Sequence, residues 1–403
     1  FVGSVRCVYE TDSKHDDHDD SHAEEFHEEI ALVIEEFEHG HMTESQSIEA
    51  IEEILHEHEG DGHDHGAGTI EEIEQLKDCG ISDFLYSVAI VPSKLKRIAS
   101  CLSDNCKVTV TVDHISMARE LVNFCKTTGS KISAVIELDF DGHRSGVRPN
   151  AKQQIIEIGK CLSDAGLFRG IMSHAGASYS LSNDEDLIKC AKDEAEQTLQ
   201  AVNILKYVSI DCELVTIGST PTALADYHNN EINELRAGVF VFFDLVQAGV
   251  GVCEIEDTAL SVLTSVISVN KEIDAIIVDA GWMALSSDRG TSLQKIDFGY
   301  GQVCYEDGKI IEDVIVSGVQ QEHGIIQVRK GSKAKLPEIK PGEMLRILPN
   351  HACATAAAHD RYYVDNDKSS EIEVWHRFNG CLLYTSDAAD EGLGVDLGGR
   401  RII

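Results

Sequence analysis

The sequence contains no apolar run that approaches the roughly 18 residues of a membrane-spanning helix, although 42% of its 403 residues are hydrophobic. We therefore expect no transmembrane segment. Basic residues are also scarce, because 34 Lys and Arg stand against 70 Asp and Glu, which gives a net charge of −36. Such a charge disfavours binding to nucleic-acid phosphates and to anionic membrane surfaces. Neither nucleic acid nor membrane is expected among the partners.

Paired cysteine motifs and an export signal are absent as well. The 12 cysteines are irregularly spaced without a Cys-x-x-Cys pair, and the chain starts at Phe1 with no basic segment before an apolar core. Scattered cysteines in a large chain without an export signal are typical of reduced thiols in the cytosol. The expected location is cytoplasmic.

The negative charge is concentrated near the amino terminus. Residues 1–66 contain 21 Asp and Glu against Arg6 and Lys14. Apolar residues at 30–37 and 48–55 have helical spacing, which predicts a head that is helical or disordered. The head also holds ten histidines: His15, His18, His22, His27, His39, His41, His56, His58, His63 and His65. It could bind Zn, Ni or Cu loosely or be an acidic tail, and both readings stay open.

From Thr69 to about residue 255, short apolar segments alternate with amphipathic ones. This alternation predicts a parallel α/β sheet or barrel. The predicted strands are 84–91, 108–112, 134–138, 170–173, 214–217 and 239–243, and the predicted helices are 69–79, 114–127, 151–164 and 184–205. Six strands fall short of the eight that close a (β/α)8 barrel, so the predicted barrel is incomplete.

Residues 256–380 predict a second, all-β domain, because one strand-like segment follows another without helical patterns between them. The predicted strands are 260–269, 274–278, 302–305, 310–317, 324–329, 344–347, 361–364 and 371–375.

Three loops that follow predicted barrel strands carry polar groups at the end where barrel sites form. Gly218, Ser219 and Thr220 could present amides and hydroxyls to a phosphate, or form an ordinary turn that caps a helix. The charged loop 139–146 is a candidate binding loop or a solvated loop. The segment 174–179, with a histidine and a tyrosine, decides nothing alone.

His351 and Cys353 form the sharpest motif. In an extended segment, residues two apart point to the same side. Imidazole and thiolate suit Zn²⁺, and two protein ligands leave positions open for water or substrate. For an arbitrary His-x-Cys sequence, a buried cysteine beside a surface histidine is the more frequent arrangement.

Together these motifs resemble the D-serine dehydratase family of eukaryotes and its bacterial relatives, over roughly residues 69–380. The resemblance rests on Leu348–Ala356 with His359–Val364, Asp83–Tyr86 with Ile90–Leu95, Asp279–Trp282, and Glu322–Gly324. D-Threonine and D-3-hydroxyaspartate aldolases share the architecture, but the His-x-Cys pair favours a dehydratase.

The resemblance implies an α/β protein with an alanine-racemase-like barrel and a C-terminal β domain. It implies a pyridoxal-phosphate and zinc enzyme that converts a small D-amino acid, D-serine, to pyruvate and ammonia. By the same resemblance, Gly218, Ser219 and Thr220 hold the cofactor phosphate, Arg144 contacts the cofactor ring oxygen and Tyr179 lines the pocket. His351 and Cys353 hold the zinc. A homodimer is expected by family analogy.

The chain departs from the family pattern in two places. The family's Schiff-base lysine string, like Pro-His-x-Lys-Thr-His-Lys, has no counterpart, and Lys14 is the sole lysine before Lys77. Residues 381–403 resemble translated adapter sequence and are expected to be non-native. The alternatives to a dehydratase are therefore a D-β-hydroxy-amino-acid aldolase, and a non-catalytic His-rich metal-binding protein built on a defective barrel.

Overall fold

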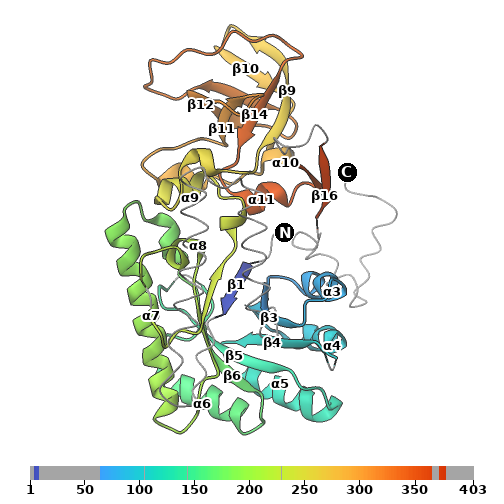
Figure 1. Ribbon diagram of the computed structural model, residues 1–403, viewed down its shortest axis with the longest axis vertical. Helices are drawn as coiled ribbons and strands as arrows, with labels where there is room; N and C mark the ends of the chain where they lie inside the picture. Colours follow the sequence, from blue (N-terminus) through green and yellow to red (C-terminus); the bar gives the residue numbers. More distant parts are fainter. Residues whose placement is uncertain are drawn as a thin grey trace, which may run out of the picture.

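The computed structural model describes residues 4–8 by their backbone, residues 64–364 apart from Asp104, His143 and His228, and residues 372–377. The predictions of helical or disordered structure for most of the head, and of a non-native tail after residue 380, lie outside these described residues. Two domains follow each other along the described chain. Figure 1 shows the C-terminal sheet above the N-terminal barrel, with short helices α9, α10 and α11 between them.

The first domain is a closed barrel of eight strands in the order β1 to β8. Its strands are β1 (Ser4–Val8), β2 (Asp64–Ala67), β3 (Asp83–Ala89), β4 (Lys107–Val112), β5 (Ser133–Leu138), β6 (Phe168–Ser173), β7 (Leu214–Ile217) and β8 (Glu234–Ala237). Its helices are α3 (Ile70–Asp78), α4 (Pro92–Cys101), α5 (Ile115–Thr128), α6 (Lys152–Ser163), α7 (Asp184–Lys206) and α8 (Thr220–Ala223). Strands β2 to β8 run parallel.

The expectation that the barrel lacks two strands is wrong. β1 and β2 fill the two positions, and β1 closes the ring by pairing with both β2 and β8. β1 is antiparallel to both neighbours, unlike the other strands. Both strands are short and lie in or beside the acidic head, so their own apolar pattern is too weak to predict them.

The predicted strand 239–243 is also wrong. The strand is β8, five residues earlier, and Val239–Val241 forms the 3-10 turn η2. The buried positions of β8 are Glu234 and Arg236. Because the buried positions of β8 are charged, a search for apolar runs does not find this strand. The turn after it is apolar and was therefore predicted as a strand.

Local sequence explains where the barrel helices begin and end. Thr69 and Glu72 form a capping box that starts α3, and the Asn183 side chain accepts the Asp186 amide at the start of α7. Gly129 adopts a left-handed conformation with φ 76° and ends α5. The apolar faces of these helices pack on the outer side of the strands in one large core, which fixes the strand ends where the loops meet.

The second domain contains a closed antiparallel barrel in the order β10-β13-β12-β11-β14-β9. Its strands are β9 (Val262–Asn270), β10 (Ala275–Val278), β11 (Gln302–Tyr305), β12 (Ile310–Val319), β13 (Gly324–Val328) and β14 (Met344–Leu348). A separate pair contains β15 (Arg361–Val364) and β16 (Glu373–His376). The prediction of a β domain behind the barrel is confirmed.

The sequence did not predict the short helices between the domains: α9 (Leu245–Val250), α10 (Trp282–Leu285) and α11 (Ala352–Ala356). None of the helices in the described part of the chain is long and apolar enough to cross a membrane.

Candidate active site

The loop after β7, residues 218–222, has a conformation that requires its glycine. Gly218 has φ 123°, and a Cβ there would lie 2.6 Å from the Arg236 carbonyl oxygen. Ser219 then caps α8 in a reciprocal capping box with Thr222. The sequence alternatives of a phosphate loop and a helix-capping turn therefore describe the same residues, since a capped helix start also presents amides to an anion.

Each amide of this loop already has a partner. Gly218 N donates to Glu194 Oε1 at 3.0 Å, and Ser219 N donates to Thr222 Oγ1 at 3.1 Å. The Thr220 amide hydrogen-bonds the hydroxyl of Tyr179. The loop thus brings three predicted cofactor-binding residues together with Tyr179, and the phosphate cradle itself stays a prediction.

Glu194 on α7 is a functional-site residue that sequence reasoning missed. Its side chain is fully buried and accepts from Gly218 N, from Thr222 Oγ1 at 2.9 Å and from Ser173 Oγ at 3.0 Å. The pKa of Glu194 is raised overall, because the effect of burial exceeds the opposite effect of the Gly218 amide. A signal was available, because Glu194 lies three residues after Ala191 on the apolar face of an amphipathic helix.

Arg236 on β8 ties the same loop to the barrel interior. The guanidinium donates to Thr216 Oγ1 at 2.5 Å and to the Ser173 carbonyl, and burial lowers its pKa to about 10. A buried charge needs such partners, so the barrel beneath the loop has a polar, hydrogen-bonded interior at Arg236.

Arg144 comes from the loop after β5, as the sequence suggested. Its guanidinium lies 3.5 Å from a carboxylate oxygen of Glu137, which is buried while Arg144 is 47% exposed. The pKa of Glu137 is raised overall, because the effect of burial exceeds the opposite effect of the Arg144 charge. The loop is joined to the next one, because Asp141 Oδ2 accepts the Ala177 amide at 2.8 Å.

His174 and Tyr179 lie between these loops. His174 Nδ1 is 2.9 Å from the Gly218 carbonyl oxygen, and burial together with Arg144 and Arg236 lowers its pKa to about 4. The imidazole is therefore neutral near pH 7 and donates from Nδ1. Burial and then the nearby Cys353 raise the pKa of Tyr179 to about 12. This effect places Cys353 beside the barrel loops.

The segment 349–353 of the β domain is held against the barrel through residues that follow β8. Leu245 N and Val246 N donate to the Pro349 and Asn350 carbonyls at 3.1 and 3.2 Å. Asp244 Oδ2 accepts the Ala352 amide at 2.9 Å across 108 residues of sequence. Two domains therefore contribute to one site.

The prediction of an extended segment for His351 and Cys353 is wrong. His351 is extended, with φ −137° and ψ 105°, but it is the residue before α11, and Cys353 is already helical. The alanine-rich stretch after His351 favours a helical turn. The two side chains nevertheless meet, since they form a hydrogen bond to each other.

A carboxylate completes the surroundings of His351. Asp288 Oδ2 lies 2.9 Å from His351 Nδ1. This hydrogen bond, followed by the one to Cys353, raises the pKa of His351 to about 10, and the same contact lowers the pKa of Asp288. Within the described residues, no group of three or more His, Cys, Asp and Glu side chains could hold a metal ion.

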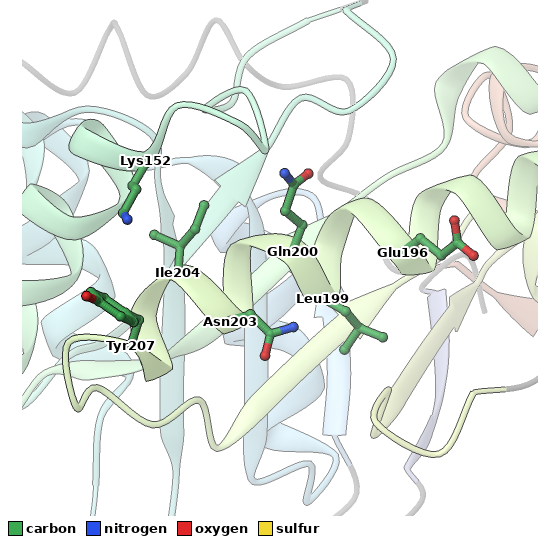
Figure 2. A pocket seen from close by; sticks show the side chains of 7 residues that line it. All are labelled: Lys152, Glu196, Leu199, Gln200, Asn203, Ile204 and Tyr207. Carbon is green, nitrogen blue, oxygen red and sulfur yellow. The ribbon is translucent and has the colours of Figure 1, made fainter.

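A groove of about 560 Å³ lies on the outside of the barrel and shares no residue with this cluster. Figure 2 shows its lining side chains on α7, with Lys152 and Tyr207 at one end. The lining residues are Lys152, Glu196, Leu199, Gln200, Asn203, Ile204 and Tyr207.

Comparison with known proteins matches the two domains to two family models. Residues 46–246 match the model of the alanine racemase N-terminal domain, and residues 259–365 match that of the serine dehydratase domain. The D-threo-3-hydroxyaspartate dehydratase of Delftia sp. is 41% identical over 77% of this chain and 83% of its own. The chain belongs to the D-serine dehydratase family. The D-serine dehydratase of Dictyostelium discoideum is 30% identical over 72% of this chain and 76% of its own.

One similar solved structure is that of a relative in its metal-free form. It is the metal-free form of a Cys-to-Ala mutant of D-threo-3-hydroxyaspartate dehydratase, with a TM-score of 0.77, 35% identity, and coverage of 89% of this chain and 96% of that one. The expected alanine-racemase-like barrel with a C-terminal β domain is confirmed.

No lysine in the described part of the chain is among the hydrogen-bond or ion-pair partners of Arg144, Tyr179, Ser219 and His351. Lys94, at the start of α4, donates to Tyr86 Oη at 2.9 Å, and Tyr86 belongs to the core between strands and helices.

Proposed function

We propose that this protein is a lyase that eliminates the hydroxyl group of small β-hydroxy D-amino acids, with pyridoxal phosphate and zinc. The candidate substrates are D-serine and D-threo-3-hydroxyaspartate, which relatives at 30% and 41% identity use. The observation that carries the proposal is the docking of segment 349–353 against residues 244–246 after β8, because it brings a metal-type donor pair to the loops at the end of the barrel.

The residues present fit both groups. His351 and Cys353 offer imidazole and thiolate, a donor set that suits zinc. The loop 218–222 offers hydroxyl residues at the carboxyl end of β7, the end of a barrel where phosphate groups bind, while its amides have partners within the protein. When bound, pyridoxal phosphate supplies an electron sink for the Cα carbanion, and zinc supplies a Lewis acid for the departing hydroxide.

The neighbouring residues bind and orient. Tyr179 keeps its proton near pH 7, because its pKa is about 12, so it can donate a hydrogen bond into the site. His174 is neutral and holds the Gly218 carbonyl. The Arg144 guanidinium is partly exposed beside Glu137 and can bind an anionic oxygen of cofactor or substrate.

Product analysis tests the proposal. The full chain is supplied with pyridoxal phosphate, zinc and either D-amino acid, and the products are measured. A dehydratase yields ammonia and a 2-oxo acid, whereas an aldolase yields glycine and an aldehyde and would overturn the assignment of elimination. A chain that binds zinc at neither His351 nor Cys353, and does not bind pyridoxal phosphate, would contradict the whole proposal.

We further propose that the polypeptide with the printed sequence holds pyridoxal phosphate without a covalent bond. Schiff-base formation needs a neutral lysine amine, and the one lysine before Lys77 is Lys14, whose acidic neighbours favour its ammonium form. Borohydride should therefore fix no cofactor to the protein, and the elimination measured in the product analysis should be slow. A borohydride-stable adduct mapped to any lysine would overturn this proposal while leaving the proposed reaction in place.

A further inference from the structure

The hydrogen bond between Asp288 and His351 selects which imidazole nitrogen faces a metal. Asp288 Oδ2 is 2.9 Å from Nδ1, and the two residues are 63 positions apart in the chain. An ionised carboxylate accepts hydrogen bonds and cannot donate them, so Nδ1 carries the proton. In the neutral ring the lone pair is then on Nε2, the nitrogen that can bind a metal.

Asp288 is itself held in place. Its Oδ1 accepts the Gly290 amide at 2.6 Å, and its own amide donates to Ser286 Oγ at 3.2 Å. Ser286 has φ 70°, a left-handed conformation that is strained for a serine and is kept by the surrounding contacts. The carboxylate therefore has a fixed direction relative to its own loop.

The loop of Asp288 is in turn tied to the segment that carries His351. Asn350 is buried, and its Nδ2 donates to the Asp288 carbonyl at 3.0 Å and to the Gly299 carbonyl at 2.7 Å. Thr291 Oγ1 donates to Asn350 Oδ1 at 3.2 Å. Both ends of the Asp288–His351 contact thus belong to one cross-linked unit.

A role limited to folding would explain this arrangement poorly. The His351 and Asp288 side chains are 41% and 31% exposed, and ion pairs at such exposure contribute little to stability. Asp288 is also not placed as a third ligand, because its Oδ2 faces His351 Nδ1 and no group of three metal-binding side chains occurs among the described residues.

We propose that Asp288 is a positioning residue for the metal: it holds His351 with Nδ1 protonated and Nε2 directed toward a cation shared with Cys353. The inference rests on the proposed function, since it requires that His351 and Cys353 bind zinc. Carboxylate partners of metal-binding histidines typically change metal affinity by about 10- to 100-fold.

The test uses cobalt(II) alone as the probe, with the full chain in its metal-free form. Binding is followed by the charge-transfer absorption of a cobalt–thiolate bond, because the histidines of residues 1–66 cannot produce this band. The variants are Asp288→Asn, which keeps an acceptor but loses the charge, and Asp288→Ala, which loses both. Asp313→Asn is the matched control, since it changes a half-exposed carboxylate paired with Arg329 in the same domain.

We expect cobalt affinity to fall about tenfold in Asp288→Asn and up to about a hundredfold in Asp288→Ala, and to stay within about twofold in Asp313→Asn. The role of Asp288 would be overturned if the band is present in the wild type and absent in Cys353→Ala, but both Asp288 variants bind cobalt with the affinity of the wild type. A band that is absent in the wild type, or kept in Cys353→Ala, would instead overturn the metal pair and with it the proposed function. Thermal unfolding of each variant shows whether a lost band reflects a lost fold.

Discussion

The two halves of the candidate site are stabilised in opposite ways. The proposed phosphate loop, residues 218–222, is closed by buried partners of its own domain: Glu194 accepts from the Gly218 amide, and His174 donates to the Gly218 carbonyl. The metal segment, residues 349–353, has a buried and cross-linked backbone, but its donor side chains are partly exposed. The hydrogen bonds of loop 218–222 are buried and contribute to the stability of the barrel. The His351 and Cys353 side chains are partly exposed and contribute little to the stability of the β domain.

We therefore expect substitutions in the two regions to affect the unfolding free energy and ligand binding differently. Substitutions around the phosphate loop should affect folding and binding together, since the same hydrogen bonds serve both. Substitutions of the metal donors should affect metal binding with little effect on folding. Measurements of unfolding free energy along this series can confirm or contradict the distinction.

The largest expected effect belongs to Glu194→Ala. It leaves the Gly218 amide and two hydroxyls without their acceptor inside the protein, which should lower the unfolding free energy by about 3–5 kcal/mol. Denaturant unfolding measures the change. Glu196→Ala, an exposed position on the same helix that pairs with Lys192, should change it by less than about 0.5 kcal/mol. Equal losses of unfolding free energy in both variants would show that the buried hydrogen bonds of Glu194 do not stabilise the fold.

A smaller effect should come from the protonation of His174. Its folded pKa of about 4 lies below the ordinary value of 6.5, so the unfolded chain takes up the proton first as the pH falls. The unfolding free energy should therefore drop by about 3 kcal/mol between pH 6.5 and pH 4 from this residue.

The variant His174→Gln, which keeps a donor for the Gly218 carbonyl, should lack that part of the pH dependence. The control is His323→Gln, at an exposed position between β12 and β13. Parallel curves for the wild type and His174→Gln over this range would mean that His174 is protonated as easily folded as unfolded.

The smallest effect is expected for Cys353→Ala. Cys353 is half-buried and its loss removes one sulfur, so the unfolding free energy of the metal-free protein should change by less than about 1 kcal/mol. Metal binding at the site should nevertheless be lost. A loss of stability as large as that of Glu194→Ala would contradict the distinction between the two regions.

The sequence predicted the elements whose signals are local. Alternating apolar and amphipathic segments indicated the strands from β3 to β7 and the β domain behind them, and the turn residues after those strands located Arg144, Tyr179 and the phosphate loop. The His-x-Cys pair was visible because both donors are neighbours in the chain. Periodicity failed where charge replaced apolar residues, as in β8, and where strands were short, as in β1 and β2.

The remaining features depend on contacts between distant parts of the chain. Glu194 reaches Gly218 across 24 residues, Asp288 reaches His351 across 63, and Asp244 reaches the Ala352 amide across 108. The sequence around a carboxylate in a helix or loop does not indicate which residue it will contact. The contact depends on the order of the loops around the barrel and on how the β domain packs against it. The sequence by itself determined the two architectures and the chemistry of the donor pair. The tertiary structure decided barrel closure, the docking of segment 349–353 against the residues after β8, and the carboxylates that hold each half of the site. Each of these requires the whole chain to be folded before the two groups are neighbours.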